Sequence, residues 1–472
     1  MFPYLFLGRI VNEIVTRTAT YTPEDTIAAI ATPVGSGGIG IVRLSGANAL
    51  PILQRIFRPG DQPFVPRALT YGHIVDPGSD QVVDEVLAVY MPAPRTYTRQ
   101  DVVEIDCHAG PVPLRRVLDL CLQEGARLAR PGEFTLRAFL NGRIDLAQAE
   151  AVADLVEAKT EAGLRMAVAQ LEGRLSGRIR QVRAQLLNAL SRLEAGLDFD
   201  EDEIPLYPIA QELCAALKAL DDLLARADQG IIYRQGARAA IVGRPNVGKS
   251  SLLNALLRAD RAIVTHIPGT TRDTLEETLN LNGIPLVLVD TAGIRSDARD
   301  LIEGLGIERS RAALAQADLA LLVVDASVPL VAQDAGIAAL IGDKPAIVVI
   351  NKIDLPVVAQ ADGLLPHVPR VAISALTGEG IEALERAIEG AVLAGHVTVA
   401  EDALAGNARH RDVLRRARQR VEAAMATCRA GLPADFVSVD LAEAVDALGE
   451  ITGETVHDTL LETIFSRFCI GK

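Results

Sequence analysis

The sequence predicts a protein of mixed α/β and α class. An N-terminal α+β domain precedes an all-helical bundle domain, into which a phosphate-loop domain with a doubly wound sheet is inserted. Three observations predict this fold. A glycine-rich loop at residues 243–250 lies between a short apolar run and a helical run. Apolar residues recur every three or four positions from Leu164 to Leu197 and again beyond Asn407. β-type runs occupy much of the chain before residue 136.

We expect five segments along the 472 residues. They are an N-terminal extension (1–23), an α+β domain (24–138), the first half of a helical domain (139–235), the phosphate-loop domain (236–400) and the second half of the helical domain (401–472). Phe2, Arg9 and Arg17 are typical of a transit peptide, which would place the protein in mitochondria. Glu13 and the lack of serine in this segment instead favour a disordered extension or an upstream start codon.

The N-terminal α+β domain is predicted from β-type runs separated by turn residues and short helical patterns. The runs are Ile27–Ala31, Gly40–Leu44, Val86–Tyr90 and Val102–Ile105. Residues 35–40 fit the glycine pattern of dinucleotide-binding domains, but a strand-like run follows them where that fold needs a helix. We therefore interpret this glycine segment as a turn.

The helical domain is predicted from a long helix that starts at Asp145 and from two later runs, Val437–Ile451 and Val456–Phe465. The phosphate-loop domain lies between these halves in the sequence, so we expect it to be an insertion. Arginines at positions 409, 411, 415, 416, 418 and 420 cluster on one expected helix. They indicate either a local RNA contact or an ordinary solvated face.

Residues 243–250 read Gly-Arg-Pro-Asn-Val-Gly-Lys-Ser, after the apolar run 239–242 and before the helical run 251–257. In that context the glycines allow a tight turn, and backbone N–H groups at a helix N-terminus wrap the phosphates. Lys249 supplies positive charge, and the Ser250 hydroxyl can ligate magnesium. We therefore predict that a nucleoside triphosphate is bound by Asn246, Val247, Gly248, Lys249, Ser250 and Ser251.

The base is predicted from Asn351, Lys352 and Asp354, which follow the apolar run 345–350. A doubly wound sheet binds its ligand at the carboxyl ends of the strands. There the Asp354 carboxylate can accept two hydrogen bonds from the N1–H and amine of guanine, whereas adenine offers no such pair. The nucleotide is therefore predicted to be GTP, with Ser374 and Ala375 in the loop behind the guanine.

The γ-phosphate side of the site is predicted from a hairpin and the loop that follows it. Two apolar runs, 275–281 and 284–289, flank the turn signal Asn282-Gly283 and lead to Asp290 and Gly293. The Asp290 carboxylate can hold the magnesium shell, and the Gly293 N–H can meet the γ-phosphate. This hairpin is therefore expected to lead directly into the catalytic end of the site.

A threonine loop lies upstream of that hairpin, where Thr271 offers magnesium a second hydroxyl. The order of phosphate loop, threonine loop, Asp-x-x-Gly, Asn-Lys-x-Asp and Ser-Ala is that of a Ras-like P-loop GTPase. Ile294 stands where Ras-type enzymes carry the glutamine that orients the attacking water. Some other group must therefore organise hydrolysis.

Three stretches outside this domain match one family. They are residues 25–46, which begin Asp-Thr-Ile, residues 131–150, which begin Pro-Gly-Glu-Phe, and the terminal Phe-Cys-Ile-Gly-Lys at 468–472. From residue 25 onward the chain resembles the MnmE (TrmE) family of tRNA-modification GTPases. The ending is a specific mark, because a cysteine followed by Ile-Gly-Lys is not a lipidation box.

The resemblance implies a homodimer that acts on tRNA in a heterotetramer with an MnmG-like flavoprotein, which carries FAD. Together they would install a carboxymethylaminomethyl or aminomethyl group at carbon 5 of the wobble uridine. The one-carbon unit would come from 5-formyltetrahydrofolate or methylenetetrahydrofolate, bound by the N-terminal domain, which would also dimerise. The implied folate-binding residues are Arg43, Glu104, Arg143 and Lys472.

The resemblance also implies how hydrolysis proceeds without the missing glutamine. Potassium would take the part of an arginine finger, bound by Asn246, Thr265, Ile267 and Thr270, of which Thr265 and Thr270 would also contact GTP. Glu303 would help to organise the attacking water, although the segment that joins it to Gly293 is slightly longer than in the family pattern. Cys469 would be catalytic, either by attacking the uracil ring or by shaping the pocket.

Composition fits a soluble cytoplasmic protein. No apolar run approaches the roughly 18 residues that span a bilayer, so no membrane partner is expected. The net charge of −14 argues against nonspecific polyanion binding, so RNA contact would have to be local. Five cysteines show no paired spacing typical of zinc or disulfides, and we expect most of them to be buried.

A second class of function stays open on the residues: a regulatory GTPase switch that binds protein partners and performs no chemistry on RNA. The terminal Cys-Ile-Gly-Lys and the separate N-terminal domain favour the tRNA-modifying enzyme. Folate binding discriminates between the two, because a pure switch has no reason to bind folate.

Overall fold

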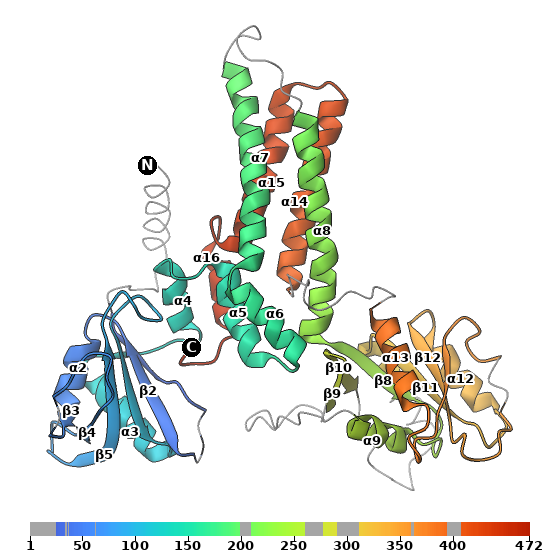
Figure 1. Ribbon diagram of the computed structural model, residues 1–472, viewed down its shortest axis with the longest axis horizontal. Helices are drawn as coiled ribbons and strands as arrows, with labels where there is room; N and C mark the ends of the chain where they lie inside the picture. The colour runs from blue at the N-terminus through green and yellow to red at the C-terminus, as the bar shows by residue number, and fades with distance from the viewer. Residues whose placement is uncertain are drawn as a thin grey trace. The chain divides into compact units, whose positions relative to one another are not determined.

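The computed structural model describes residues 25–33, 35, 37–61, 63–198, 209–259, 277–289, 311–359, 363–393 and 407–472. The expected N-terminal extension lies outside these residues. The chain divides into two compact units, Met1–Ala153 with Asp446–Lys472, and Asp154–Val445 (Figure 1). The first unit therefore joins the beginning of the chain to its end.

The first unit contains an N-terminal sheet whose described strands follow the order β3–β4–β5–β6–β2–β1–β7. Neighbouring strands are antiparallel except for β1 and β7. The β-type runs expected from the sequence form β1, β2, β5 and β6, and a strand follows the glycine segment as expected. The bounds are β1 Ile27–Ile30, β2 Ile39–Ser45, β3 Phe57–Pro59, β4 Thr70–Val75, β5 Val82–Met91, β6 Val102–His108 and β7 Arg127–Leu128.

The alternation of side chains along β1 gives this sheet two different faces. Ala28 joins a core with helices α2 (Ala49–Ile56) and α3 (Pro111–Gln123). Ile27 and Ala29 instead pack with Phe134 of α4 (Glu133–Leu140). Helix α4 also shares a core with α16 (Asp458–Phe465) and the first part of α5 (Leu146–Glu157). The last helix of the chain is thereby held beside α4.

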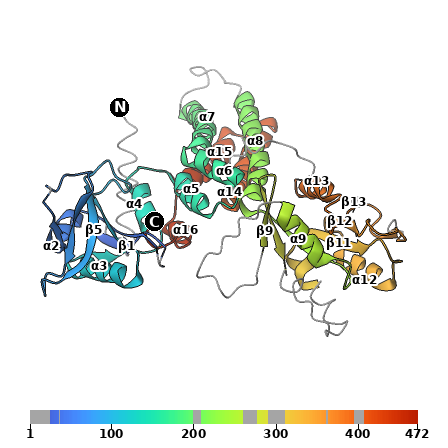
Figure 2. The same cartoon turned by 60° about the horizontal axis from the view of Figure 1, so that its bottom comes forward.

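The helical part of the second unit contains α6 (Glu161–Leu171), α7 (Arg174–Asp198), α8 (Ile209–Gln235), α14 (Ala408–Arg429) and most of α15 (Ala434–Thr452). Helices α8 and α14 lie side by side in both views (Figures 1 and 2). The expectation of one long helix from Asp145 is wrong. Thr160 begins α6 by accepting a hydrogen bond from the Gly163 N–H (3.1 Å), and Gly173 has a φ of +86° before α7. These two positions divide the periodic run into α5, α6 and α7.

The inserted domain has a second sheet, whose described strands follow the order β13–β12–β11–β8–β10–β9. Only β9 is antiparallel to its neighbour, and its pairing of Leu281 with Ile284 confirms the hairpin expected at Asn282-Gly283. The bounds are β8 Ala237–Val242, β9 Glu277–Leu281, β10 Ile284–Val289, β11 Leu319–Asp325, β12 Ala346–Asn351 and β13 Arg370–Ala372.

Helices cover both faces of this sheet. Helices α9 (Lys249–Ala259) and α13 (Ile381–Val392) share one core with alternate residues of β8, and α12 (Ala332–Ile341) shares the other. The predicted fold class is therefore confirmed: an N-terminal α+β domain, a helical domain and an inserted doubly wound P-loop domain.

Two remaining expectations concern the surface. Among the described helices, none is both long and apolar enough to cross a bilayer. The expectation that most cysteines are buried is wrong. Cys107 and Cys121 are buried, but Cys428 is half-buried and Cys214 and Cys469 are exposed. Cys214 lies on the solvent-facing side of α8, Cys428 lies in the last turn of α14, and Cys469 lies in the terminal segment.

Candidate functional site

The phosphate loop lies at the carboxyl end of β8, between Val242 and the start of α9 at Lys249. Strand β8 has β10 on one side and β11 on the other, both parallel to it. Asp325 ends β11 and Asn351 ends β12, so their side chains reach the same edge of the sheet. Doubly wound sheets bind their ligands at such a switch in strand order.

The loop backbone adopts conformations that depend on its glycines. Gly243 has a φ of +152°, and a Cβ there would lie 2.4 Å from the Val323 carbonyl oxygen. Gly248 has a φ of +97°, and its Cβ would lie 2.2 Å from Asn351 Nδ2. Asn246 is left-handed as well, with a φ of +64°. The loop therefore has no room for side chains at its two glycines.

Lys249 is held by the loop itself. Its Nζ donates hydrogen bonds to the carbonyl oxygens of Gly243 (2.9 Å) and Arg244 (2.7 Å). Burial lowers the pKa of this ammonium. The lysine thus lies against the backbone of the loop that wraps phosphates in this class of fold.

Asn351 and Lys352 join the phosphate loop to the neighbouring strands. Asn351 Nδ2 donates to the Val247 carbonyl oxygen (2.9 Å), and Asn351 Oδ1 accepts from the Ala375 N–H (3.0 Å). Lys352 Nζ donates to the Asn246 carbonyl oxygen (2.8 Å) and to Asp325 Oδ2 (2.5 Å). The Asn-Lys-x-Asp segment therefore supports the loop before it meets any ligand.

Asp325 was not identified from the sequence, although it ends an apolar run at the ligand edge of the sheet. Burial raises the pKa of this carboxyl, but hydrogen bonds from Lys352 and Ser327 outweigh it, so that the pKa lies below its usual value. Asp325 stays ionised and fixes the Lys352 ammonium beside the loop.

Asp354 lies in the exposed part of the same segment. One of its oxygens, Oδ1, accepts a hydrogen bond from Ser374 Oγ at 2.6 Å. Ser374 is fully buried, whereas Asp354 is exposed. A buried hydroxyl thus orients a carboxylate that faces outward, which is the arrangement needed to bind the edge of a base.

The remaining nucleotide-site predictions fall outside the described residues. They are Thr265, Ile267, Thr270, Thr271, Asp290, Gly293 and Glu303. Ser250 and Ser251 are described, and they lie in the first turn of α9 directly after Lys249.

A second group of predicted residues meets in the first unit, beside the last five residues of the chain, which we call the C-terminal tail (468–472). Arg43 on β2 is the register partner of Glu104 on β6. Its Nε lies 2.7 Å from Glu104 Oε1, and its Nη1 donates to the Gly471 carbonyl oxygen at 3.3 Å. The Arg43 guanidinium carbon also lies 5.8 Å from the centre of the Phe134 ring. Arg43 therefore joins the sheet, α4 and the tail.

Arg143 lies beside a ring that the sequence did not single out. Its guanidinium carbon is 4.7 Å from the centre of the Tyr97 ring, and Tyr97 Oη is 3.0 Å from Thr135 Oγ1. Burial raises the pKa of Tyr97, while the hydrogen bond with Thr135 and the charges of Arg143 and Arg43 act against it. The positive charges of Arg143 and Arg43 therefore both act on the Tyr97 hydroxyl.

Lys472 and Cys469 complete this group, which we call the tail site: Arg43, Tyr97, Glu104, Phe134, Arg143 and the C-terminal tail. The Lys472 carbonyl oxygen accepts from the Phe134 N–H (3.2 Å), and the Cys469 oxygen accepts from the Gly132 N–H (3.5 Å). The Cys469 side chain is exposed. Of the four predicted folate residues, Lys472 lies in the tail, Arg43 and Glu104 pair beside it, and Arg143 lies against Tyr97.

Comparison with known proteins identifies the family. A family model described as the MnmE helical domain matches residues 146–469, and one described as the GTP-binding protein TrmE N-terminus matches residues 26–143. The tRNA modification GTPase MnmE of Roseiflexus castenholzii is 53% identical over 468 residues, which cover 95% of this chain and 99% of that protein. The chain belongs to the MnmE family of tRNA modification GTPases.

Other relatives agree. The MnmE proteins of Chloroflexus aurantiacus and Geobacillus kaustophilus are 52% and 47% identical, covering 95% and 96% of this chain and 100% of each relative. Similar solved structures include the G domain of the T. maritima FeoB iron transporter (28% identity, 33% of this chain, 98% of that chain, TM-score 0.24). Another is translation elongation factor SelB from Methanococcus maripaludis (22% identity, 34% of this chain, 35% of that chain, TM-score 0.26).

The arginine cluster of this MnmE-family chain is largely neutralised. On α14, Arg411 pairs with Asp228, Arg416 with Asp412, Arg418 with Asp221 and Glu422, and Arg420 with Asp440 and Glu443. Phosphate binding requires cations that are free to neutralise it. Of the two interpretations left open by the sequence, the structure therefore favours a solvated, ion-paired helix face.

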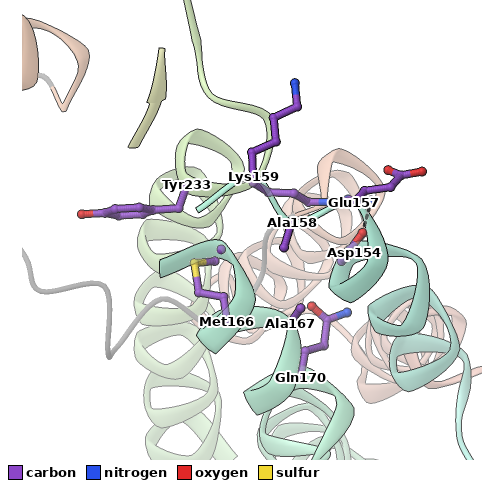
Figure 3. Close-up of a pocket in the computed structure, with 10 residues that line it drawn as sticks. Asp154, Glu157, Ala158, Lys159, Met166, Ala167, Gln170 and Tyr233 are labelled. Atoms are coloured by element: carbon purple, nitrogen blue, oxygen red, sulfur yellow. Dashed lines mark ion pairs between the residues drawn. The ribbon is translucent and has the colours of Figure 1, made fainter. Parts of the chain in front are cut away.

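A cavity of about 330 Å³ lies in the second unit, lined by residues of α5, α6 and α8 (Figure 3). Asp154 and Arg234 form an ion pair across its wall, with 2.5 Å between Oδ1 and Nη2. The cavity lies at the end of α8 that leads into β8, whereas the phosphate loop follows the other end of that strand. Six strand residues separate the two by roughly 20 Å. The cavity is therefore not part of the nucleotide site.

Proposed function

We propose that this MnmE-family GTPase installs a carboxymethylaminomethyl or aminomethyl group at carbon 5 of the wobble uridine in tRNA. It would do so with an MnmG-like flavoprotein that carries FAD, using a folate one-carbon unit. The observation that supports the proposal is the tail site. A regulatory switch would need only the nucleotide site, whereas this chain also brings its terminal segment against the Arg43–Glu104 pair.

The nucleotide site supports GTP as the ligand. Asp354, oriented by Ser374, would accept hydrogen bonds from guanine, while residues 246–251 with Lys249 would hold the phosphates. The phosphate-binding and base-binding parts of the site are both supported by hydrogen bonds of Asn351, Lys352 and Ala375. In this proposal Thr265, Thr270, Thr271, Asp290 and Gly293 complete the GTP site.

Magnesium and potassium fit the oxygen donors of the nucleotide site. Ser250 would ligate magnesium with Thr271, and Asn246 would bind potassium with Thr265, Ile267 and Thr270. Hydroxyl, amide and carbonyl oxygens suit such cations. Asn246 is exposed, and its left-handed backbone is held by Lys352, so its side chain is available at the edge of the loop. Bound cations would neutralise charge that develops on the phosphates, and Glu303 would help to organise the attacking water.

The tail site fits 5-formyltetrahydrofolate or methylenetetrahydrofolate. The rings of Tyr97 and Phe134 lie beside the guanidinium groups of Arg143 and Arg43. The flat ring system of a folate would therefore meet aromatic rings, and its carboxylates would meet guanidinium groups. Lys472 and Glu104 add a further cation and an acceptor. Cys469, exposed at the same place, would be the catalytic group nearest the uracil.

The proposed assembly is a homodimer joined to the flavoprotein in a heterotetramer, acting in the cytoplasm on tRNA. An exposed apolar pair on the N-terminal sheet supports a protein contact there. Tyr71 on β4 faces Leu87 on β5 in register, and they are 47% and 37% exposed. Covering such exposed apolar surface with a partner is favourable, because it removes that surface from water.

The test compares Arg43→Met with Arg55→Met in the full chain. Arg55 is an exposed arginine of the same domain that pairs with Glu124, away from the tail. We expect Arg43→Met to weaken binding of 5-formyltetrahydrofolate, measured by calorimetry, and to lower the tRNA modification measured by mass spectrometry of nucleosides. GTP hydrolysis, followed by phosphate release, should be unchanged in both variants.

Two outcomes would contradict the proposal. Full tRNA modification after deletion of residues 469–472 would remove the tail from the chemistry. A wild-type protein that binds no folate, yet responds to GTP, would instead support the regulatory switch without RNA chemistry.

A further inference from the structure

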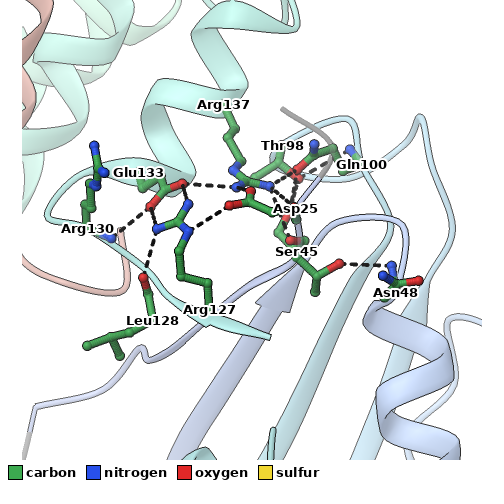
Figure 4. A network of polar contacts seen from close by, with 11 residues as sticks. Asp25, Ser45, Asn48, Thr98, Gln100, Arg127, Leu128, Arg130, Glu133 and Arg137 are labelled. Carbon is green, nitrogen blue, oxygen red and sulfur yellow. Dashed lines mark hydrogen bonds and ion pairs between the residues drawn. The ribbon is translucent and has the colours of Figure 1, made fainter. Parts of the chain in front are cut away.

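Helix α4 carries a fully buried arginine, Arg137, whose hydrogen bonds reach Asp25, Ser45 and Gln100 in three other segments (Figure 4). Arg137 Nη1 donates to the Asp25 carbonyl oxygen (2.8 Å) and to Gln100 Oε1 (3.0 Å). Its Nη2 donates to Asp25 Oδ1 (2.5 Å) and to Glu133 Oε1 (3.0 Å). Burying such a charge is unfavourable unless it is fully paired, and an apolar residue would fill the same space at less cost. The network therefore suggests a role beyond packing.

Glu133 connects this arginine to the turn before α4. Its carboxylate is almost fully buried and accepts hydrogen bonds from Arg127 Nη2 (2.6 Å) and from the Arg130 N–H (2.8 Å). Burial raises the pKa of Glu133, but these bonds and the charge of Arg137 outweigh it and hold the pKa below its usual value. An ionised Glu133 thus fixes the conformation of residues 130–133.

That turn is the surface against which the C-terminal tail lies. Gly132 has a φ of +67°, and a Cβ there would lie 2.7 Å from the Phe465 carbonyl oxygen and 3.0 Å from Phe468 Cβ. The N–H groups of Gly132 and Phe134 donate to the tail carbonyl oxygens of Cys469 and Lys472. A shift of the turn by a fraction of an ångström would therefore break the contacts that hold the tail.

The other side of the tail is equally close to the sheet. Gly471 has a φ of +95°, and a Cβ there would lie 2.5 Å from the Ile30 carbonyl oxygen on β1. The tail thus lies between β1 and the start of α4, and both are tied to Arg137, the first through Asp25, two residues before β1. A movement of β1 or of the start of α4 would therefore move the tail and Cys469 with it.

We propose that the Pro131–Phe134 turn is the docking seat of the C-terminal tail, and that Arg137 and Glu133 are positioning residues that hold Cys469 beside Arg43. The proposal rests on the proposed function only for what Cys469 then does. Neither residue needs to touch a substrate. They act through α4, which presents backbone N–H groups to the tail.

The first test is Gly132→Ala in the full chain, which leaves Arg137 and Glu133 in place. The readout is amide hydrogen exchange in the peptide that contains Phe134, followed by mass spectrometry, because the Phe134 N–H donates to the Lys472 carbonyl oxygen while the tail is docked. Peptides of α8, in the other unit, provide an internal reference. We expect exchange at Phe134, relative to α8, to rise by about fivefold or more, the factor that loss of one buried hydrogen bond predicts.

The second test separates the network from the turn. Arg137→Lys keeps the positive charge but removes the planar guanidinium group, whose Nη2 donates to both Asp25 and Glu133. Glu133→Gln keeps the volume and removes the charge, and it decides the outcome if the lysine variant does not fold. Arg116→Lys is the matched control, because Arg116 forms an exposed pair with Asp76 in the same domain. We expect both network variants, but not the control, to raise hydrogen exchange at Phe134 and lower tRNA modification with GTP hydrolysis unchanged.

The outcomes are distinguishable. Folded variants of Gly132, Arg137 or Glu133 with the wild-type rate of hydrogen exchange at Phe134 would overturn the docking seat. A raised rate with unchanged binding of 5-formyltetrahydrofolate and unchanged tRNA modification would support the seat while contradicting the role proposed for the tail in catalysis.

Discussion

The nucleotide site and the tail site are built in opposite ways. The phosphate loop is one continuous segment, and its shape depends on backbone conformation at Gly243 and Gly248. The tail site gathers side chains from distant parts of the chain, such as Arg43 and Gly471, which are 428 residues apart. Its geometry depends on buried ion pairs, chiefly those of Arg137.

The two sites are therefore expected to lose function in different ways. A loop shaped by its backbone is damaged by a side chain added at Gly243 or Gly248, and only a few distant residues, Asn351 and Lys352, support it. A site built from charged side chains tolerates no loss of a partner, because an unpaired buried charge is left behind. The two sites lie in different units, so we expect a substitution that abolishes binding at one site to leave binding at the other unchanged.

The largest effect is expected from Gly248→Ala. Its new Cβ would meet Asn351 Nδ2 at 2.2 Å in a backbone conformation that alanine rarely adopts. We expect GTP affinity, measured by calorimetry, to fall by more than about a hundredfold, because both the loop strain and the lost Asn351 bond act together. Gly336→Ala on α12, with open space around it, is the control and should bind GTP normally. Normal GTP binding by Gly248→Ala would contradict the geometry of the loop.

Potassium is expected to have the next largest effect. If potassium neutralises charge at the phosphates beside Asn246, replacing it with sodium at equal ionic strength should lower the rate of GTP hydrolysis steeply. An arginine finger is worth roughly 10³ to 10⁵ in rate, so even a partial substitute should be visible. Phosphate release in the two salts gives the answer. Equal turnover would remove Asn246 from the mechanism.

Some parts of the fold and of the two sites could be predicted from the sequence, and others could not. The phosphate loop, the Asn-Lys-x-Asp segment and the hairpin at Asn282-Gly283 were predictable, because each carries its geometry in consecutive residues. Asp325 and Tyr97 were missed, since their roles depend on strand order and on which loop lies beside which helix. The break at Thr160 was missed for a related reason: apolar periodicity continues across it, and only the cap hydrogen bond reveals it.

The base contact provides a sharper test of the nucleotide site. Asp354→Asn places an amide donor where the amine of guanine needs an acceptor, and we expect preference to shift from GTP toward xanthosine triphosphate. Loss of a hydrogen bond to a charged group corresponds to roughly a tenfold to hundredfold weaker binding of GTP. Competition binding with GTP, xanthosine triphosphate and ATP measures it. Unchanged discrimination among the three would show that Asp354 does not bind the base.

The smallest effect concerns the pH dependence of the network behind the tail site. Burial raises the pKa of Asp25, but hydrogen bonds from Arg127 and Arg137 outweigh it and hold the pKa below its usual value. A carboxyl with a lowered pKa stabilises the fold above the usual value near 4 and loses that contribution as the pH falls through the lowered one. Asp25→Asn should therefore lower the unfolding midpoint at pH 7 by about 2–4 °C for each kcal/mol lost.

That difference should narrow as the pH falls below about 4, because the Asp25 carboxyl of the unfolded wild-type chain becomes protonated there before that of the folded protein. Thermal unfolding of both proteins between pH 7 and pH 3 measures it, with Asp61→Asn, an exposed carboxylate of the same domain, as the control. A difference that stays constant over this range would mean that Asp25 contributes through its shape and not through its charge. The tail site would then resemble the phosphate loop, with backbone contacts such as the bond from Arg137 to the Asp25 carbonyl oxygen as its main support.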